Sequence, residues 1–255
     1  MKITTKKYIS IGMAGVLILA CWMGMKTKEE TVYLEAQPVL AQEDEGKKII
    51  YLTFDDGPSQ NTEAVLQMLA EADAKATFFV TNEFPAYINL IREEEQQGHT
   101  IGIHTYSHKY EEIYQNSDAY FSDIEKMQEI LYEQTGKKSK VLRFPGGSSN
   151  TISRNYCNGI MSQLTKEVME KGYAYYDWNA TNGDGDTSLD ASALIEKAKK
   201  EIGSQDVVML LMHDGAGNEE TVKALPQILQ YCKEQGYEFR AIDETTPVFH
   251  HHVNN

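Results

Sequence analysis

The sequence predicts an α/β fold: a distorted (β/α) barrel of about seven parallel strands, preceded by an N-terminal membrane segment. Short runs rich in β-branched and aromatic residues alternate with longer amphipathic stretches, which is typical of strand–helix units in a parallel sheet. Lysines followed by an apolar run begin the chain and indicate the membrane segment. Because seven strands are fewer than the eight of a complete barrel, the pattern alone leaves an open doubly wound sheet as an alternative.

Each element of the barrel is predicted from its local pattern. The expected strands are short, and they cover residues 49–54, 76–80, 100–104, 141–144, 173–178, 207–213 and 237–242. The expected helices cover residues 61–71, 87–97, 117–133, 154–171, 191–202 and 220–235. One helix therefore separates each pair of successive strands, as a crossover between parallel strands requires.

The N-terminal residues have the pattern of an export signal. Three lysines, Lys2, Lys6 and Lys7, precede an apolar run over residues 8–25, which is long enough to span a membrane because about 17 to 25 residues are needed. We therefore expect an extracytoplasmic protein, anchored to the membrane through residues 1–25. An uncleaved signal anchor and a lipoprotein signal with lipidation at Cys21 both fit, since residues 18–21 resemble a lipobox. Cleavage after Ala41, which would release the chain, is a further alternative.

The composition of the rest of the chain indicates its domain organisation and excludes some classes of partner and site. Residues 26–46 are polar and acidic and predict a linker, so that the folded domain covers residues 47–255. The net charge of −14 at pH 7 argues against a nucleic-acid partner, because phosphate backbones are bound by clustered lysine and arginine. The three cysteines lie too far apart for a disulfide framework or a structural zinc knuckle. We expect a monomer.

Ionisable residues gather at the ends of five predicted strands, where barrels place their active sites. In chain order they are Asp55, Asp56, His104, Arg143, Asp177 and His213. The first two belong to the segment Thr-Phe-Asp-Asp-Gly-Pro-Ser at residues 53–59. Neighbouring side chains of an extended chain point in opposite directions, so the two aspartates need not share one task. A turn held by local hydrogen bonds alone is the alternative for this segment.

Two imidazoles, His104 and His108, are spaced so that one helical turn or a tight loop can direct both to a single point. Two histidines and one carboxylate, with an open coordination position, are the usual ligands of a catalytic zinc ion. Asp56 is the natural third ligand. Taken by itself, a histidine pair of this spacing is more often a surface or core feature.

Two further strand ends could complete a hydrolytic site. Arg143 is followed by Phe-Pro-Gly-Gly, which offers a guanidinium for a carboxylate and free backbone amides for an oxyanion. His213 ends an apolar run in which Leu211 precedes it by two residues. With Asp177 on the adjacent predicted strand to raise its pKa, His213 is a candidate general acid.

These five motifs, in this order and spacing, resemble those of the NodB-homology polysaccharide deacetylases, which include chitin and peptidoglycan deacetylases. The resemblance covers about residues 47–242 and implies a distorted barrel of strand–helix units, with the catalytic domain in residues 47–255. It implies Asp55 as general base, Arg143 to orient it, His213 as general acid with Asp177, and the metal ligands Asp56, His104 and His108. It also implies the Gly146 amide as oxyanion donor, with Trp178 and Leu211 beside the substrate. The family's Arg-x-Pro-Tyr element appears here as Arg-Phe-Pro-Gly, so a glycine stands in place of the tyrosine.

The resemblance therefore implies a metal-dependent hydrolase that removes N-acetyl groups from a cell-wall polysaccharide. Zinc is the expected metal, and cobalt or nickel suit the same ligands. We expect N-acetylglucosamine of peptidoglycan as the substrate. Chitooligosaccharides, N-acetylmuramic acid and acetylated xylan are alternatives, and so is a catalytically silent wall-binding module on the same fold.

Overall fold

The computed structural model describes residue 44 and residues 46–255. The expected membrane segment, its lipidation site and nearly all of the expected linker lie outside these residues. Within the described part, no helix is long and apolar enough to span a membrane. Asp44, at the end of the expected linker, is buried and accepts two hydrogen bonds from the Arg240 guanidinium, so it packs with the folded domain.

The prediction of an α/β fold built on parallel strands is confirmed. Every described strand pairing is parallel, and the strands follow the order β5-β4-β3-β2-β1-β7-β6, with β8 also beside β1. The bounds are β1 Lys48–Asp55, β2 Ala76–Val80, β3 Thr100–Ile103, β4 Val141–Leu142, β5 Ala174–Tyr175, β6 Ala180–Thr181, β7 Val207–His213 and β8 Tyr237–Phe239. The two-residue strand β6 has no counterpart in the sequence prediction.

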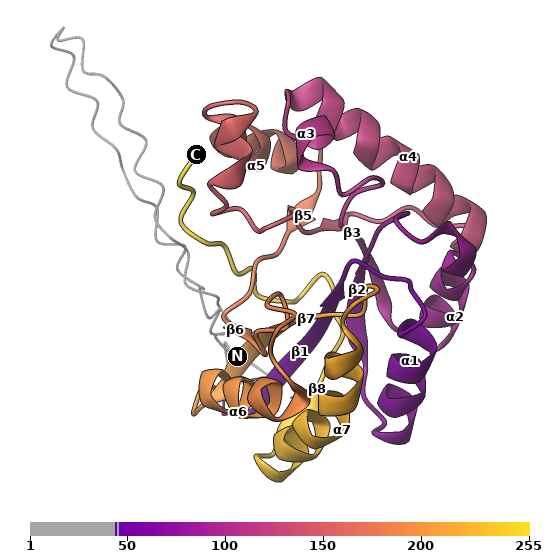
Figure 1. Ribbon diagram of the computed structural model, residues 1–255, viewed down its shortest axis with the longest axis vertical. Coiled ribbons are helices and arrows are strands. Elements are labelled where there is room, and N and C mark those ends of the chain that lie inside the picture. The colour runs from indigo at the N-terminus through magenta and orange to yellow at the C-terminus, as the bar shows by residue number, and fades with distance from the viewer. Residues whose placement is uncertain (1–43, 45) are drawn as a thin grey trace, which may run out of the picture. The chain divides into compact units, whose positions relative to one another are not determined.

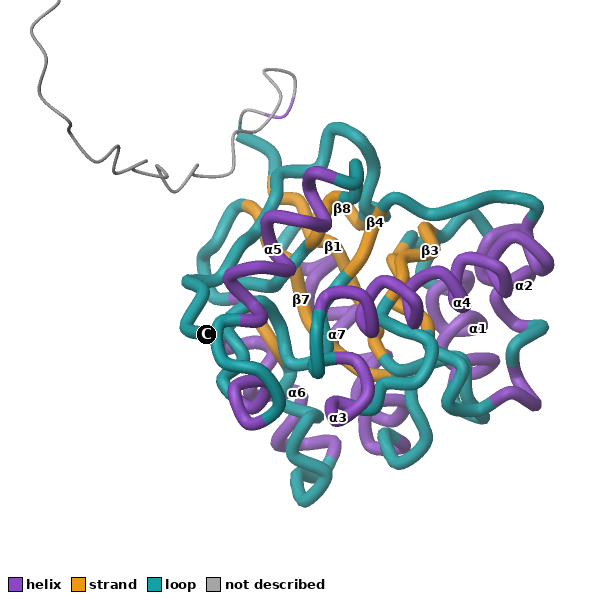
Figure 2. The backbone as a smooth tube through the Cα atoms, turned by 90° about the horizontal axis from the view of Figure 1, so that it is seen from above, coloured by secondary structure: helices purple, strands orange, loops and turns teal. Residues whose placement is uncertain are grey.

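Helices cover the outside of this curled sheet (Figures 1 and 2). Their bounds are α1 Thr62–Glu71, α2 Leu90–Gln96, α3 Tyr110–Ile113, α4 Ser117–Thr135, α5 Ile160–Glu170, α6 Ala191–Ile202 and α7 Glu219–Glu234, with short 3-10 turns η2 Pro85–Tyr87 and η3 Ile152–Asn155. The single helix expected over residues 154–171 is in fact divided, because Gly159 adopts a left-handed conformation between η3 and α5. The short helix α3 is absent from the sequence prediction.

The alternation of side chains along β1 divides the interior into two regions. Ile50, Leu52 and Phe54 face the helices and belong to the main apolar core. Ile49 and Tyr51 face the inside of the curled sheet, in a smaller cluster with Phe79 and Met209. The same alternation carries Thr53 and Asp55 to the inner side, at the carboxyl end of the strand.

The C-terminal segment fills the side on which no ladder joins β5 to β6 within the described residues. The Asp177 amide, just after β5, donates to the Phe249 carbonyl at 2.8 Å. The imidazole of His250 stacks on the Tyr175 ring with centroids 3.7 Å apart. The barrel is therefore closed here by an irregular segment in place of a strand pair.

Candidate active site

The candidate site begins at the end of β1. Asp55 is in strand conformation and almost wholly buried, whereas Asp56 adopts a left-handed backbone with a φ of 72°. Such a conformation is uncommon outside glycine and recurs at functional sites. The change of backbone direction between the two residues lets the neighbouring carboxylates face different partners.

The turn after Asp56 is fixed by the end of β7. The Asp214 amide donates to the Asp55 carbonyl at 3.1 Å, and the Ser59 hydroxyl donates to the Asp214 carbonyl at 2.5 Å. A Cβ at Gly57 would lie 2.3 Å from both carboxylate oxygens of Asp214, so only glycine fits at this position. Burial, and to a lesser degree the charges of Asp56 and Asp55, raise the pKa of the Asp214 carboxyl to about 7.

Three potential metal ligands meet above this turn. Ligand atoms of Asp56, His104 and His108 all lie within 4.8 Å of one another. Asp56 Oδ1 is 3.5 Å from His104 Nε2 and 3.4 Å from His108 Nε2. Ligands about 2.0 to 2.1 Å from a tetrahedral ion lie roughly 3.3 Å apart, so the two separations from Asp56 suit a small divalent cation.

The hydrogen bonds around the three ligands also fit a metal. Asp56 Oδ1 is buried and has no hydrogen-bond partner within residues 46–255, which leaves an acceptor for a cation. His104 Nδ1 lies 2.8 Å from the Arg143 carbonyl, so this nitrogen carries the proton and Nε2 has a free lone pair. On the far side of the other imidazole, His108 Nδ1 faces the Glu83 carboxylate at 3.8 Å. The residues present therefore fit a divalent metal.

A loop held by α4 presents His108 to this centre. The Asp123 carboxylate accepts from the amides of Tyr106 and Ser107 at 2.6 and 3.2 Å, and the Thr105 hydroxyl accepts from the His108 amide at 3.0 Å. His108 itself has a φ of 54°. Two of the three candidate ligands thus stand in the left-handed region, where the surrounding hydrogen bonds must compensate the conformational cost.

The protonation of the ligands suits metal binding. Burial lowers the pKa of His104, although the nearby carboxylates of Asp55 and Asp56 partly oppose this effect. Burial raises the pKa of Asp56, but the charges of His213, His104 and His108 outweigh it, and the net shift is downward. A neutral imidazole and an ionised carboxylate are the forms that bind a cation.

Arg143 lies inside the barrel and holds Asp55. The guanidinium is wholly buried and donates to Asp55 Oδ1 at 2.8 Å and to the Thr53 hydroxyl at 2.7 Å. It also donates to the Tyr176 carbonyl at 2.9 Å and lies 4.2 Å from the centroid of the Phe79 ring. The other oxygen of Asp55 faces His104 Nε2 at 3.9 Å. This carboxylate therefore stands between the arginine and the three ligands.

His213 faces the same centre from β7. The sheet register pairs Asp55 with His213 on neighbouring strands, so their side chains point to the same side. Burial disfavours the charged imidazole, but the hydrogen bond and charge of Asp184, with the charges of Asp56 and Asp55, raise the pKa of His213 to about 10. An imidazole that is protonated at neutral pH can donate a proton.

The predicted pairing of Asp177 with His213 is wrong. The partner is Asp184, whose carboxylate accepts from His213 Nδ1 and from the His213 amide, both at 2.7 Å. The Thr221 hydroxyl also donates to Asp184 at 2.6 Å. Asp184 follows β6, so it obeys the same rule of polar residues at strand ends. The sequence reasoning missed it because it missed β6.

Asp177 has a different set of partners. Its buried carboxylate accepts from the Ser148 amide at 2.8 Å, from the Ser148 hydroxyl at 2.5 Å and from the His251 amide at 2.8 Å. Asp177 therefore binds the loop after β4 to the C-terminal segment. The next residue, Trp178, is held by its carbonyl, which lies 2.7 Å from His251 Nε2.

The loop after β4 contains the predicted oxyanion donor. Gly146 and Gly147 both have positive φ, at 76° and 77°. A Cβ at Gly147 would lie 2.9 Å from the Trp178 ring, so the loop and this ring are in close contact. The Gly146 amide makes no hydrogen bond with any other described residue. Leu211 lies on β7 two residues before His213 and pairs with Thr53 in the sheet register, so it lies below the site on the inner face.

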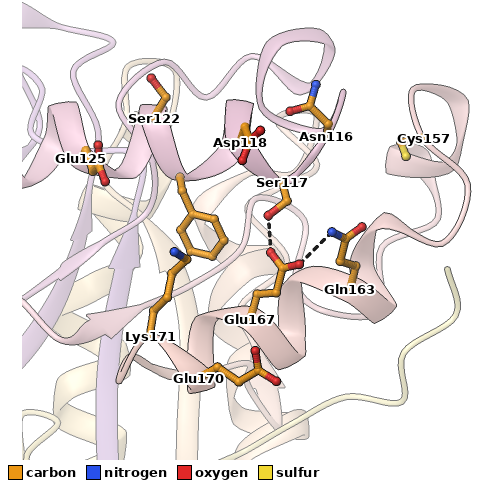
Figure 3. A pocket seen from close by; sticks show the side chains of 11 residues that line it. Asn116, Ser117, Asp118, Ser122, Glu125, Cys157, Gln163, Glu167, Glu170 and Lys171 are labelled. Atoms are coloured by element: carbon orange, nitrogen blue, oxygen red, sulfur yellow. Dashed lines mark hydrogen bonds between the residues drawn. The ribbon is translucent and has the colours of Figure 1, made fainter.

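A groove elsewhere on the domain is not part of this centre. It has a volume of about 790 Å³ and lies between α4 and α5, where the Glu167 carboxylate accepts from the hydroxyl of Ser117 and the amide of Gln163 (Figure 3). Its lining is largely polar and acidic and includes none of the candidate metal ligands or catalytic residues.

Comparisons with known proteins agree with these features. The sequence model of a family described as "Polysaccharide deacetylase" matches residues 42–161. A peptidoglycan-N-acetylglucosamine deacetylase of Bacillus cereus is 34% identical over 218 residues, which cover 82% of this chain and 75% of that protein. A putative polysaccharide deacetylase of Bacillus subtilis is 30% identical over 234 residues, covering 89% of this chain and 78% of that protein.

The fold is also similar to solved structures. The crystal structure of the catalytic domain of a peptidoglycan N-acetylglucosamine deacetylase from Eubacterium rectale superposes with a TM-score of 0.81 at 43% identity. The match covers 86% of this chain and 98% of that one.

Proposed function

Because this chain belongs to the polysaccharide deacetylase family, whose members are hydrolases acting on N-acetyl groups, we propose that it removes acetyl groups from N-acetylglucosamine in peptidoglycan with the help of a divalent metal. The observation that carries the proposal is the convergence of three side-chain groups. The candidate ligands Asp56, His104 and His108 lie beside the Asp55–Arg143 pair, and His213 faces them from the neighbouring strand.

Asp56, His104 and His108 hold the metal, and zinc fits the donor set best, with cobalt or nickel as substitutes. When bound, the metal supplies Lewis acidity, which makes water a better nucleophile and polarises the acetyl carbonyl. His104 and His108 offer Nε2 to it, because a carbonyl or a carboxylate faces the other nitrogen of each ring.

Asp55 is the general base that takes a proton from the attacking water. Arg143 holds one carboxylate oxygen at 2.8 Å and leaves the other directed toward the ligands, which fixes the orientation of the base. The guanidinium is itself held by Tyr176 and Thr53, so the carboxylate cannot turn away. This is positioning of the kind that supports general base catalysis.

His213 is the general acid that gives a proton to the departing sugar nitrogen. Asp184 holds Nδ1 and thereby directs Nε2 toward the site. The amide of Gly146, which has no other acceptor, donates to the oxygen that gains negative charge on the acetyl group. Acetate and a free amine are the products.

We also propose that the enzyme works outside the cytoplasmic membrane, tethered through its N-terminal residues and without an obligatory partner subunit. The lysines and the apolar run over residues 8–25 support the tether, and peptidoglycan is an extracytoplasmic substrate. Peptidoglycan is preferred over chitin or xylan because relatives with 34% and 43% identity carry the name of a peptidoglycan N-acetylglucosamine deacetylase.

The decisive experiment uses the zinc-loaded protein and several acetylated polymers. Mass spectrometry should show loss of acetyl groups from N-acetylglucosamine in purified muropeptides, with less or none from chitooligosaccharides and no acetate from acetylated xylan. Deacetylation of N-acetylmuramic acid alone, or of xylan alone, would contradict the substrate. A protein that binds peptidoglycan but releases no acetate from any of the polymers would be the silent wall-binding module.

A further inference from the structure

The tyrosine that begins α3 occupies the space beside the candidate oxyanion donor. A Cβ built on Gly146 would lie 2.5 Å from the Tyr110 hydroxyl oxygen and 3.1 Å from Cβ of Asn150. Real Cβ atoms essentially never show a contact as short as the first of these, so a side chain at position 146 would require Tyr110 to move. The hydroxyl of Tyr110 therefore lies where a side chain at position 146 would begin, and the glycine is required for this reason as well as for its φ of 76°.

Packing on two sides holds the Tyr110 ring in this place. It makes edge-to-face contacts with the His108 imidazole, with ring centroids 5.8 Å apart, and with the Tyr114 ring, at 5.3 Å. Tyr114 is wholly buried, and its hydroxyl donates to the Pro145 carbonyl at 2.8 Å. Aromatic contacts thus connect the loop of His108 to the loop of Gly146, with Tyr110 between them.

Two hydrogen-bond donors at this place lack acceptors in the protein. Neither the Tyr110 hydroxyl nor the Gly146 amide donates to any residue in the described part of the chain. The Tyr110 hydroxyl is not enclosed by protein, unlike that of Tyr120, which is buried without a partner, so an acceptor from a ligand can reach it.

The two donors are close enough to share one acceptor. The amide nitrogen and Cβ of a residue lie about 2.5 Å apart, so the Tyr110 oxygen is at most about 5 Å from the Gly146 nitrogen. An oxygen within about 2.7 to 3.0 Å of both donors requires a separation below roughly 6 Å. The spacing therefore allows a single oxygen to accept from both donors.

We propose that the Tyr110 hydroxyl donates a hydrogen bond to the acetyl oxygen of the substrate, as a second donor beside the Gly146 amide. The proposal rests on the deacetylase function proposed above, because it requires an acetyl group in this position. Tyr110 is then a catalytic residue that stabilises the negative charge formed on this oxygen. It reaches the oxygen from α3, and the absence of a side chain at Gly146 leaves room for it.

The test replaces the hydroxyl and keeps the ring. Tyr110→Phe should lower kcat by at least about tenfold, less than the 10² to 10³ lost when a sole side-chain donor is removed, because the Gly146 amide remains. KM for the N-acetylated oligosaccharide should change less than threefold. Zinc content by elemental analysis and the melting temperature should match the unmodified protein, since the aromatic contacts with His108 and Tyr114 persist. Tyr132→Phe, which alters an exposed tyrosine on α4, is the matched control and should leave all four quantities unchanged.

A binding measurement gives a second test that needs no turnover. Acetate places a carboxylate oxygen where the acetyl oxygen lies, so its dissociation constant for the zinc-loaded protein should rise about three- to tenfold in Tyr110→Phe, the value of one hydrogen bond. Unchanged kcat together with unchanged acetate affinity would overturn the proposal. So would a loss of zinc from Tyr110→Phe, because the hydroxyl would then support the ligand loop. If the unmodified protein releases no acetate from any polymer, the proposed function fails instead, and this outcome is distinct from an active enzyme that is indifferent to Tyr110→Phe.

Discussion

At the scale of single residues, two aspartates that are neighbours in the chain have different partners in the site. Asp55 ends a strand and contacts Arg143, whereas Asp56 has left the strand through its φ of 72° and faces two imidazoles. The division of tasks between the two aspartates could be predicted from the sequence. The left-handed turn could not, because it depends on hydrogen bonds from the end of β7.

Replacement of the two aspartates should separate base from ligand. Asp55→Asn keeps the shape and the contact with Arg143 but cannot accept a proton, so kcat should fall by about 10² to 10⁴ while zinc stays bound. Asp56→Asn removes the charge of a ligand, so zinc affinity should fall by more than about 100-fold, since even the outer partners of a ligand account for 10- to 100-fold. Elemental analysis and steady-state kinetics measure both effects. If Asp55→Asn loses zinc while Asp56→Asn keeps it, the two roles are exchanged.

The pH dependence of the reaction should identify the partner of His213. Asp184 is the principal group that raises the pKa of this imidazole toward 10 against the effect of burial, and the acid must be protonated to act. In Asp184→Asn the pKa falls toward its ordinary value, so the alkaline limb of kcat/KM should move to lower pH by at least about one unit. A bound metal cation would disfavour the charged form of His213 in variant and parent alike. The test therefore compares the alkaline limbs of the two proteins with each other.

A control for this shift is available at the residue first predicted as the partner. Asp177→Asn changes a carboxylate that contacts Ser148 and His251 and not His213. The alkaline limb of kcat/KM in this variant should therefore stay within about 0.3 pH units of the parent. A shift in Asp177→Asn without one in Asp184→Asn would mean that the observed hydrogen bond does not govern the acid.

At the scale of elements, the sequence predicted long segments well and short ones poorly. Strands such as β7 and helices such as α6 carry enough periodic residues for their pattern to be recognised, and the observed bounds of both agree with the expected ones. β6 has two residues and exists because Ala180 and Thr181 pair with β7. α3 has four residues with no apolar period. Such elements are formed by tertiary contacts, which is why Asp184 and Tyr110 were absent from the predicted site.

The C-terminal segment should contribute measurable stability. Asp177→Ala would leave two buried donors of Ser148 and the partly buried amide of His251 without their acceptor, at a cost of about 1 to 3 kcal/mol for each group left unpaired. For a domain of about 200 residues, each kcal/mol lowers the melting temperature by roughly 2 to 4 °C, so a decrease of at least 5 °C is expected by calorimetry. Ser149→Ala removes a single, weaker contact with His251 and should change the melting temperature by less than 2 °C. A melting temperature for Asp177→Ala within 2 °C of the parent would contradict this function of the segment.

At the scale of the whole molecule, the parallel sheet followed from the alternation of strand and helix patterns, but the order of its strands and the manner of closure did not. No sequence pattern distinguishes an open sheet from a barrel whose last gap is filled by irregular chain, because the contacts of Phe249 and His250 depend on where β5 ends. The resemblance to a known family implied the distorted barrel, and the parallel sheet agrees with it.

The tether can be tested on cells. With residues 1–25 as an anchor, fractionation should place the native protein in the membrane pellet, and Cys21→Ser should change its electrophoretic migration only if this cysteine is lipidated. Recovery mainly from the culture medium would exclude both forms of anchor and favour cleavage after Ala41. A fusion that lacks residues 1–25 provides the control, since it should remain in the soluble cell fraction.

The direction of β1 separates the entry of the chain into the folded domain from the catalytic aspartates. The chain enters the folded domain at Asp44 and Lys48, beside Arg240, and reaches the catalytic aspartates only at the far end of the strand. Eight residues at about 3.3 Å each place some 25 Å between these two ends. The entry of the chain and the catalytic aspartates thus lie at opposite ends of β1. A polymer would therefore reach the catalytic aspartates at the end of the domain that lies far from the entry of the chain.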